Sequence, residues 1–252
     1  MSNSPLIDYE ALSPNHSGKR KHKIDTITIH CVVGQVSVER LGEIFSKKER
    51  QASCNYGIGA DGRIALIVDE GNRSWCTSSS ENDNRAITIE VASDTKSPYA
   101  VNDKAYASLI KLCADICKRN KIEKLVWSTN KSNRVNHKNG CNMTVHRDYA
   151  NKSCPGKYLY DRHGKIAKEV NALLNAEKKA AEKKTEFKPY KAKVTAKTLN
   201  VRANAGATYK VMAIVKKNEV FTIIDEKKVG LTKWGKLKSG IGWISLSYVK
   251  KV

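Results

Sequence analysis

The chain has 252 residues, of which 40% are hydrophobic, and its 46 Lys and Arg against 25 Asp and Glu give a formal net charge of +21. This composition suits a globular protein of one large or two smaller domains and excludes a wholly disordered basic tail. No window holds the roughly 18–20 consecutive apolar residues that a membrane-spanning helix needs, so we expect no membrane span.

The amino-terminal residues and the cysteines bear on where the protein is made and works. Residues 1–23 have no apolar stretch ahead of a small-residue cleavage site, which predicts a chain made in the cytoplasm without a signal peptide. Seven cysteines are an odd number, which excludes complete disulfide pairing and favours metal ligands or core positions. The positive charge favours a polyanionic partner: nucleic acid, an anionic membrane surface or a phosphate-rich bacterial wall.

The first part of the chain predicts strands interleaved with helices. Residues 24–31 alternate at a period of two and end with His30 on the face opposite the isoleucines. Residues 85–92 alternate in the same way and place Glu90 opposite an apolar row. The pattern continues with helices over 38–45, 106–117 and 166–174, a hairpin over 55–68 and a strand over 124–128. Such alternation predicts an α/β domain.

The charge divides the chain into unequal parts. Residues 1–175 carry a net charge of +8, and residues 176–252 carry +13 in less than half that length. The change begins in an Ala, Glu and Lys-rich stretch, residues 175–192, which we interpret as a semi-rigid helical linker. We therefore place one domain at 1–174. The other, at 193–252, has short β-rich runs between Gly, Asn and Lys turns and predicts a small all-β barrel or sandwich.

Two segments carry candidate metal ligands. His30 ends the first strand, and His146 and Cys154 lie eight positions apart in a polar stretch. Zinc favours imidazole and thiolate donors, and three protein ligands leave a fourth position for water, as in catalytic sites. Packed or surface positions are the alternative, because this spacing matches no recognised finger. If Glu90 and His30 share the floor of a cleft, Glu90 could accept a proton from metal-bound water; a solvated face is the alternative.

Four ordered segments carry a family resemblance: TITIHCVVG, CNYGIGADGRI, NRAITIEVA and TVHRDYANKSCPG. Over about residues 23–174 they resemble zinc-dependent N-acetylmuramoyl-L-alanine amidases of the peptidoglycan recognition protein fold, especially phage endolysins. The resemblance implies a central mixed β-sheet flanked by helices, with Zn2+ bound by His30, His146 and Cys154. It also implies cleavage of the amide between N-acetylmuramic acid and the first L-alanine of the stem peptide.

The resemblance also implies roles for residues around the metal. Glu90 matches the acidic residue that activates the attacking water, and Lys152 matches a basic residue that stabilises the oxyanion. Some relatives carry a catalytic tyrosine just before the Asp-Gly hairpin, where this chain has Cys54. Tyr56 follows two residues later, on the same face if the strand is regular. Because Cys54 stands where those relatives have the tyrosine, no residue of this chain is assigned the role of the tyrosine. Glu90 would then carry out more of the catalysis.

The second domain carries its own resemblance. The segments Leu199–Arg202 and Gly242–Ile244 are similar to the marks of bacterial SH3-like domains of cell-wall enzymes, over nearly all of residues 193–252. This implies binding to peptidoglycan, with anionic teichoic acids as a further partner that explains the charge, and a higher local concentration of the catalytic domain at its polymeric substrate. A phage lysin of this kind would leave the cytoplasm through holin pores.

Three alternatives remain beside the amidase. A zinc peptidase that cuts within the stem peptide would use the same metal chemistry. A peptidoglycan receptor would keep the fold without catalysis, although such a receptor is expected to have lost a metal ligand, and none is missing here. A nucleic-acid-binding protein would explain the clustered lysines, but no ordered DNA- or RNA-reading motif accompanies them.

Overall fold

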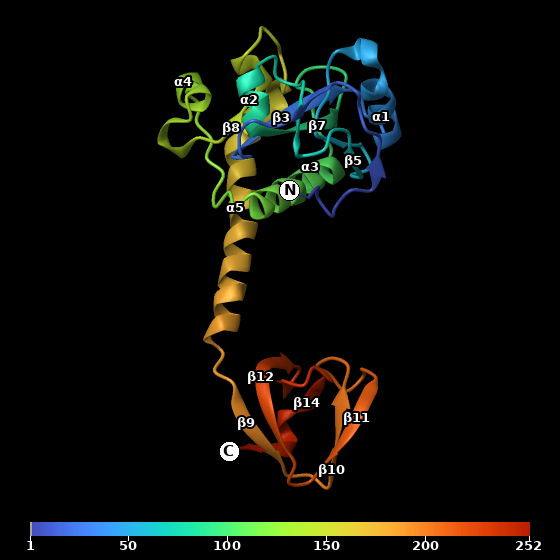
Figure 1. Ribbon diagram of the computed structural model, residues 1–252, viewed down its shortest axis with the longest axis vertical. Helices are drawn as coiled ribbons and strands as arrows, with labels where there is room; N and C mark the ends of the chain where they lie inside the picture. The colour runs from blue at the N-terminus through green and yellow to red at the C-terminus, as the bar shows by residue number, and fades with distance from the viewer. Residues whose placement is uncertain (1) are drawn as a thin grey trace. The chain divides into compact units, whose positions relative to one another are not determined.

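A computed structural model describes residues 2–252, without the side chains of residues 179–186. The chain divides into two compact units, Met1–Ala176 and Glu177–Val252. The long helix α5 (Gly156–Glu186) runs from the first unit across this division (Figure 1). The charged side chains of the predicted linker fall largely among those that are not described. None of the helices in the described part of the chain is both long and apolar enough to cross a lipid bilayer.

The first unit is built on a six-stranded mixed sheet with the order β1-β5-β4-β7-β3-β8. Its strands are β1 (Tyr9–Glu10), β3 (Thr26–Val33), β4 (Tyr56–Ile58), β5 (Ile64–Leu66), β7 (Ala86–Ser93) and β8 (Met143–Thr144). β4 and β5 form the predicted antiparallel hairpin, and β3 lies parallel to both β7 and β8. A separate two-stranded ribbon joins β2 (His16–Lys19) to β6 (Asn72–Ser74).

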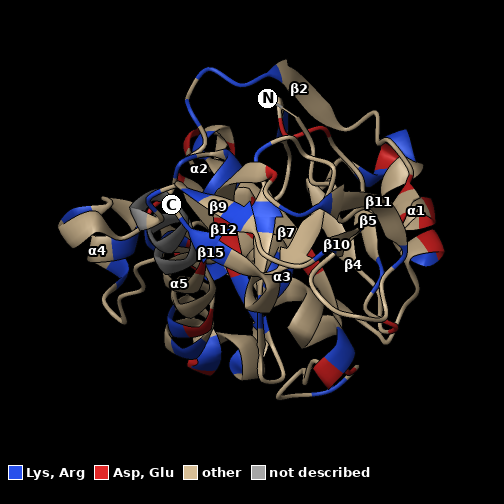
Figure 2. Ribbon diagram, turned by 90° about the horizontal axis from the view of Figure 1, so that it is seen from below, with Lys and Arg blue, Asp and Glu red and all other residues tan. Residues whose placement is uncertain are grey.

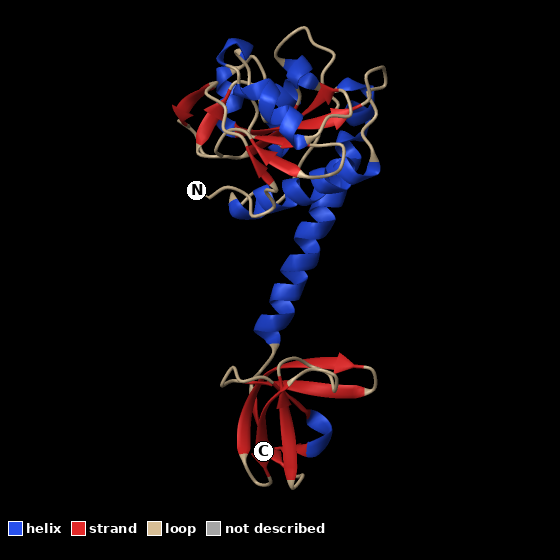
Figure 3. Ribbon diagram, turned by 90° about the vertical axis from the view of Figure 1, so that its right-hand side faces the viewer, coloured by secondary structure: helices blue, strands red, loops and turns tan. Residues whose placement is uncertain are grey.

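Helices cover both faces of this sheet (Figure 3). They are α1 (Val38–Ser46), α2 (Ser80–Arg85), α3 (Asp103–Arg119), α4 (Lys131–Val135) and α5, with 3-10 turns η1 (Lys48–Arg50), η2 (Lys138–Gly140) and η3 (His146–Asp148). α1 begins after Ser37, whose side chain accepts a hydrogen bond from the Arg40 amide. The predicted architecture, a mixed sheet flanked by helices, is confirmed.

The two faces of β3 bury different side chains. Ile27 and Ile29 join one core that includes apolar residues of α3 and α5. The opposite face carries Thr28 and His30, which are also fully buried. The predicted alternation is therefore confirmed, but the polar face is not a solvated surface. Parallel strands in the middle of a sheet are commonly buried on both faces, so the polar side chains there need internal partners.

The strand predicted over residues 124–128 is wrong. No strand forms there, and the edge position beside β3 is taken by β8, at Met143 and Thr144. The physical reason is visible in the hydrogen bonds: the Leu125 amide donates to Asn171 Oδ1, and the Val126 amide donates to Asn142 Oδ1. Side-chain amides thus take the place of a neighbouring strand.

The second unit is all-β, with the strand order β11-β10-β14-β13-β12-β9-β15. Its elements are β9 (Tyr190–Val194), β10 (Thr198–Arg202), β11 (Val211–Lys216), β12 (Val220–Val229), β13 (Thr232–Leu237), β14 (Trp243–Ser245), η4 (Leu246–Tyr248) and β15 (Val249–Lys251). A small core centres on Val201, Ile223 and Ile244. Each of the strands β9, β12 and β15 carries lysine residues (Figure 2). The predicted small β domain is confirmed.

Candidate metal centre and catalytic cleft

The central strand pair places a histidine beside a carboxylate. β3 and β7 are parallel neighbours, and His30 lies directly opposite Glu90 in their register. Side chains at paired positions point to the same face of a sheet. His30 Nδ1 is accordingly 4.0 Å from Glu90 Oε1, with His30 fully buried and the Glu90 side chain 15% exposed. The two residues that the sequence predicts on one face therefore meet there.

A loop from the sheet edge brings two more donor groups to His30. β8 pairs with β3 at Thr28 and Thr144, so the segment after β8 continues along the His30 end of the sheet. His146 follows at the start of η3, with its ring centroid 5.1 Å from that of His30. The Cys154 Sγ is 3.3 Å from His30 Nδ1. One donor atom from each of these three residues lies within 4.8 Å of the other two.

This group of donors fits a zinc ion. Two imidazoles and one thiol are typical zinc ligands, and three protein ligands are typical of a catalytic site. Burial, with His146 and His163 nearby, holds the pKa of His30 well below its usual value, and burial with Lys152 nearby lowers that of His146. Both rings are therefore in the neutral form that binds metals. His30 Nδ1 is the ring nitrogen that lies near the Cys154 thiol and Glu90, and Nε2 is buried without a hydrogen-bond partner among the described residues.

Glu90 is suited to proton transfer. Burial, and to a lesser extent Cys31, raises its pKa to about 8, against a smaller opposing effect of Arg50. A carboxyl group with a pKa near neutrality can both accept and return a proton under physiological conditions. Its Oε2 is buried without a hydrogen-bond partner in the described part of the chain. Glu90 also belongs to a second possible donor group, with His30 and Cys76. A zinc ion bound by that group would use the Glu90 carboxylate as a ligand, and the carboxylate could then not serve as a proton acceptor.

An open cleft of about 640 Å³ lies over the candidate metal centre. Glu90 and His146 line it, and so does the exposed Lys152, so the three predicted residues border one space. Arg50 and Arg73 add two cations to the walls. Asp83 and Glu90 line the same space, so the cleft combines cationic and acidic groups.

Sequence reasoning missed two residues beside the ligands. Cys31 lies close enough to Cys154 for the two thiols to shift each other's pKa, downward for Cys31 and upward for Cys154. Ser78, in the turn before α2, has its Oγ 3.3 Å from His146 Nε2. Their spacing in the sequence gives no signal for either contact. Cys113, Cys117 and Cys141 are buried, and the first two lie on α3 in the core of the first unit.

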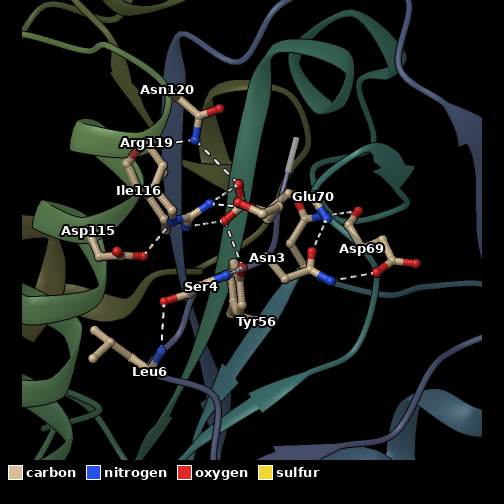
Figure 4. Close-up of polar contacts among 12 residues, drawn as sticks. Asn3, Ser4, Leu6, Tyr56, Asp69, Glu70, Asp115, Ile116, Arg119 and Asn120 are labelled. Carbon is tan, nitrogen blue, oxygen red and sulfur yellow. Dashed lines mark hydrogen bonds and ion pairs between the residues drawn. The ribbon is translucent and has the colours of Figure 1, made fainter.

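Tyr56 does not replace the missing catalytic tyrosine. It pairs with Ile89, so its side chain lies on the core face of the sheet, opposite Glu90. Its hydroxyl donates to Glu70 Oε1 at 2.7 Å (Figure 4), and neither residue lines the cleft. Cys54 instead lies near Glu90. Burial, and to a lesser extent the Glu90 carboxylate, raise the pKa of the Cys54 thiol. The expectation that both face the same way is wrong, because the backbone is irregular at Asn55, whose carbonyl accepts from both Ile67 and Val68.

Residues 20–157 match the family of N-acetylmuramoyl-L-alanine amidases, which is more than half of the chain. The chain belongs to this family. As an amidase it is a peptidoglycan hydrolase that cleaves the amide between N-acetylmuramic acid and L-alanine. Residues 197–250 match the bacterial SH3 domain. A comparison with curated proteins finds no match.

Several solved structures are similar to the amidase over about two thirds of its length. The endolysin N-acetylmuramoyl-L-alanine amidase LysCS from Clostridium intestinale URNW has 18% identity and a TM-score of 0.47, and covers 69% of this chain and 99% of its own. A mutant endolysin from Bacillus subtilis has 17% identity and a TM-score of 0.47, with 66% and 99% covered. The Drosophila peptidoglycan recognition protein SD has 14% identity and a TM-score of 0.46, with 62% and 94% covered.

Proposed function

We propose that the amidase is zinc-dependent and that His30, His146 and Cys154 hold the metal. The convergence of these three donors, far apart in the chain, on one point beside Glu90 is the observation that carries the proposal. Zinc bound there would act as a Lewis acid that polarises a carbonyl group and lowers the pKa of water. The residues around it supply substrate binding, proton transfer and charge stabilisation.

Glu90 and Lys152 divide the remaining chemistry. Glu90 takes the proton from the attacking water and returns it to the leaving amine of L-alanine, and burial, which raises its pKa, favours its holding the proton between these two steps. Lys152 at the rim of the cleft stabilises the negative charge that develops on the carbonyl oxygen. His30 stays neutral and buried, so it does not compete with Glu90 for the proton.

Metal removal is the direct test of zinc dependence. We expect exhaustive chelation to abolish the release of free amino groups from purified peptidoglycan, and zinc to restore it, with no new reducing sugars at any stage. Mass spectrometry of the products should show stem peptides that begin with an intact L-alanine. Full activity after chelation would contradict the zinc proposal, and a cut within the stem would identify a zinc peptidase instead.

We infer that residues 1–174 form the catalytic domain, residues 175–192 a linker and residues 193–252 a domain that binds the wall. The match to the bacterial SH3 domain supports this, and the basic second unit suits teichoic acid as an additional partner. By the resemblance to phage endolysins, the protein would reach the wall from the cytoplasm through holin pores. Tethering to an insoluble polymer would raise the effective concentration of the cleft at its substrate.

A groove in the second unit offers a test of wall binding. Arg202, Trp234 and Tyr248 line it, whereas Tyr209 lies outside its lining. We expect Tyr248→Ala to weaken sedimentation with purified walls by about 5- to 10-fold, because exposed aromatics supply much of the energy at binding sites. Cleavage of a soluble muramoyl peptide should not change.

Tyr209→Ala is the matched control, because Tyr209 is 44% exposed and Tyr248 53%. Equal wall binding by wild type and the Tyr248→Ala variant would argue against this groove as the wall site.

A further inference from the structure

Two of the three proposed zinc ligands come from a segment with little regular structure. After β8 ends at Thr144, the only regular element before α5 is the three-residue turn η3. Backbone hydrogen bonds in this segment are mostly short-range, such as those from Tyr149 to His146 and from Lys152 to Ala150. One longer backbone bond, from the Arg147 amide to the Cys154 carbonyl at 3.3 Å, joins the two ends of the segment. Side chains add to this single bond in holding the two ligands in place.

A buried ion pair holds the His146 end of the segment. Asp148 accepts hydrogen bonds from Arg134 Nη2 at 2.6 Å and Nε at 2.7 Å, and the two side chains are 1% and 3% exposed. Arg134 Nη1 also donates to the Ser128 carbonyl at 2.7 Å, and its guanidinium lies 4.6 Å from the ring centroid of Trp127. A planar guanidinium with two parallel bonds to one carboxylate fixes direction as well as distance.

A second arginine holds the Cys154 end. Arg147 Nε donates to the Cys154 carbonyl at 3.4 Å, and its Nη2 donates to the Ser153 carbonyl. The Arg147 amide makes a further bond to the same Cys154 carbonyl, at 3.3 Å. The Tyr160 ring of α5 lies 4.5 Å from the Arg147 guanidinium and 5.7 Å from that of Arg134. One aromatic ring thus contacts both arginines.

We propose that Arg134, Asp148 and Arg147 are positioning residues that hold His146 and Cys154 at the spacing the metal requires. None of the three lines the cleft, so they do not act on the substrate. A buried ion pair gives little net stability over apolar residues of the same size, which leaves geometry as its contribution. This inference rests on the proposed zinc site, because it concerns the affinity of that site for metal.

The first test is the zinc affinity of Asp148→Asn in the full-length protein, measured against a competing chelator at a temperature where circular dichroism shows the fold intact. Asn keeps the shape of Asp but removes the charge that Arg134 pairs with. We expect an affinity 10- to 100-fold below that of wild type, the usual cost of losing a group that supports a ligand. Arg134→Lys should give a similar loss, because an ammonium group cannot form the paired bonds.

A second arginine–carboxylate pair, in which the carboxylate is buried, provides the matched control. Glu70, 1% exposed, accepts from Arg119 on the core side of the sheet, and no metal ligand takes part in that network (Figure 4). Glu70→Gln should lower the unfolding temperature as Asp148→Asn does, yet leave zinc affinity within 2-fold of wild type. If Asp148 had only a structural role, zinc affinity would respond in the same way in both variants.

Arg147→Gln tests the other end of the segment without leaving a buried charge, and it keeps the proposal testable if Asp148→Asn fails to fold. We expect a 5- to 10-fold loss of zinc affinity, within the range for such supporting groups. Wild-type affinity in Arg147→Gln or in a folded Asp148→Asn, or an equal loss in Glu70→Gln, would overturn the inference. Failure of the wild type itself to bind zinc would instead overturn the proposed function.

Discussion

Cys154→Ser should lose both zinc and catalysis while it continues to bind cell walls. A serine hydroxyl stays neutral at physiological pH and is a poor zinc ligand, so only two imidazoles would remain at the site. Because the loss of a group behind a ligand already costs 10- to 100-fold, loss of a ligand should lower kcat/KM by more than about 100-fold. Zinc content by elemental analysis and amide hydrolysis on purified peptidoglycan measure the two effects.

Cys141→Ser is the control for this substitution. Cys141 is also buried, at 2% exposed, but it belongs to no group of possible ligands among the described residues. It should retain the zinc content and turnover of wild type. A Cys154→Ser protein with full zinc content and activity would remove Cys154 from the metal site. Wall binding that persists without turnover would also show that binding and catalysis are separable, as the alternative of a receptor requires.

Glu90→Gln should retain zinc but lose most of its activity. The amide has the shape of the carboxyl group but cannot accept or return a proton, and general acid–base catalysis contributes typically 10²- to 10⁴-fold. We therefore expect a fall in kcat of about that size with little change in KM. Stopped assays on a soluble muramoyl peptide would separate the two constants.

The control for Glu90→Gln is the same substitution at an exposed glutamate outside the cleft. Glu81 is an exposed acidic residue in the first turn of α2 and does not line the cleft, so Glu81→Gln should behave as wild type. Retention of more than about a tenth of wild-type kcat by Glu90→Gln would assign the proton transfer to another group. Loss of zinc from that variant would indicate that Glu90 belongs to the metal ligands, in the second possible group with His30 and Cys76.

The sequence predicts the sheet and its polar face well, because period-two alternation is a local property. His30 and Glu90 could be placed on one face from the spacing of their own strands, and the structure sets them opposite each other. Periodicity does not report what covers that face. His30 is fully buried beside His146 and Cys154 of a remote segment, although the pattern of its own strand suggests a solvated face.

The approach of His146 and Cys154 to His30 could be inferred only through the family resemblance. β8 is two residues long, too short for any pattern to predict, yet its pairing with β3 sets the path of the following loop. The strand expected over residues 124–128 does not form, because contacts with remote residues again decide the outcome. Its apolar residues suit a strand, but Asn142 and Asn171 take its backbone hydrogen bonds.

Side-chain contacts between remote elements could not be predicted at all. Arg134 lies in a five-residue helix of a polar stretch, where a lone basic residue suggests a solvated charge. Its partner Asp148 is fourteen positions away, and only the folded loop shows that both are buried. Tyr56 is a similar case, since one irregular residue before β4 decides which face of the sheet receives the ring.

The network around Glu70 has a practical consequence for handling the enzyme. The amino-terminal residues are fastened into it: the Ser4 amide donates to the Tyr56 hydroxyl, Arg119 donates to the Ser2 carbonyl at 2.6 Å, and Asn3 accepts from the Glu70 amide (Figure 4). Trimming this end would uncover a buried carboxylate and a phenol together.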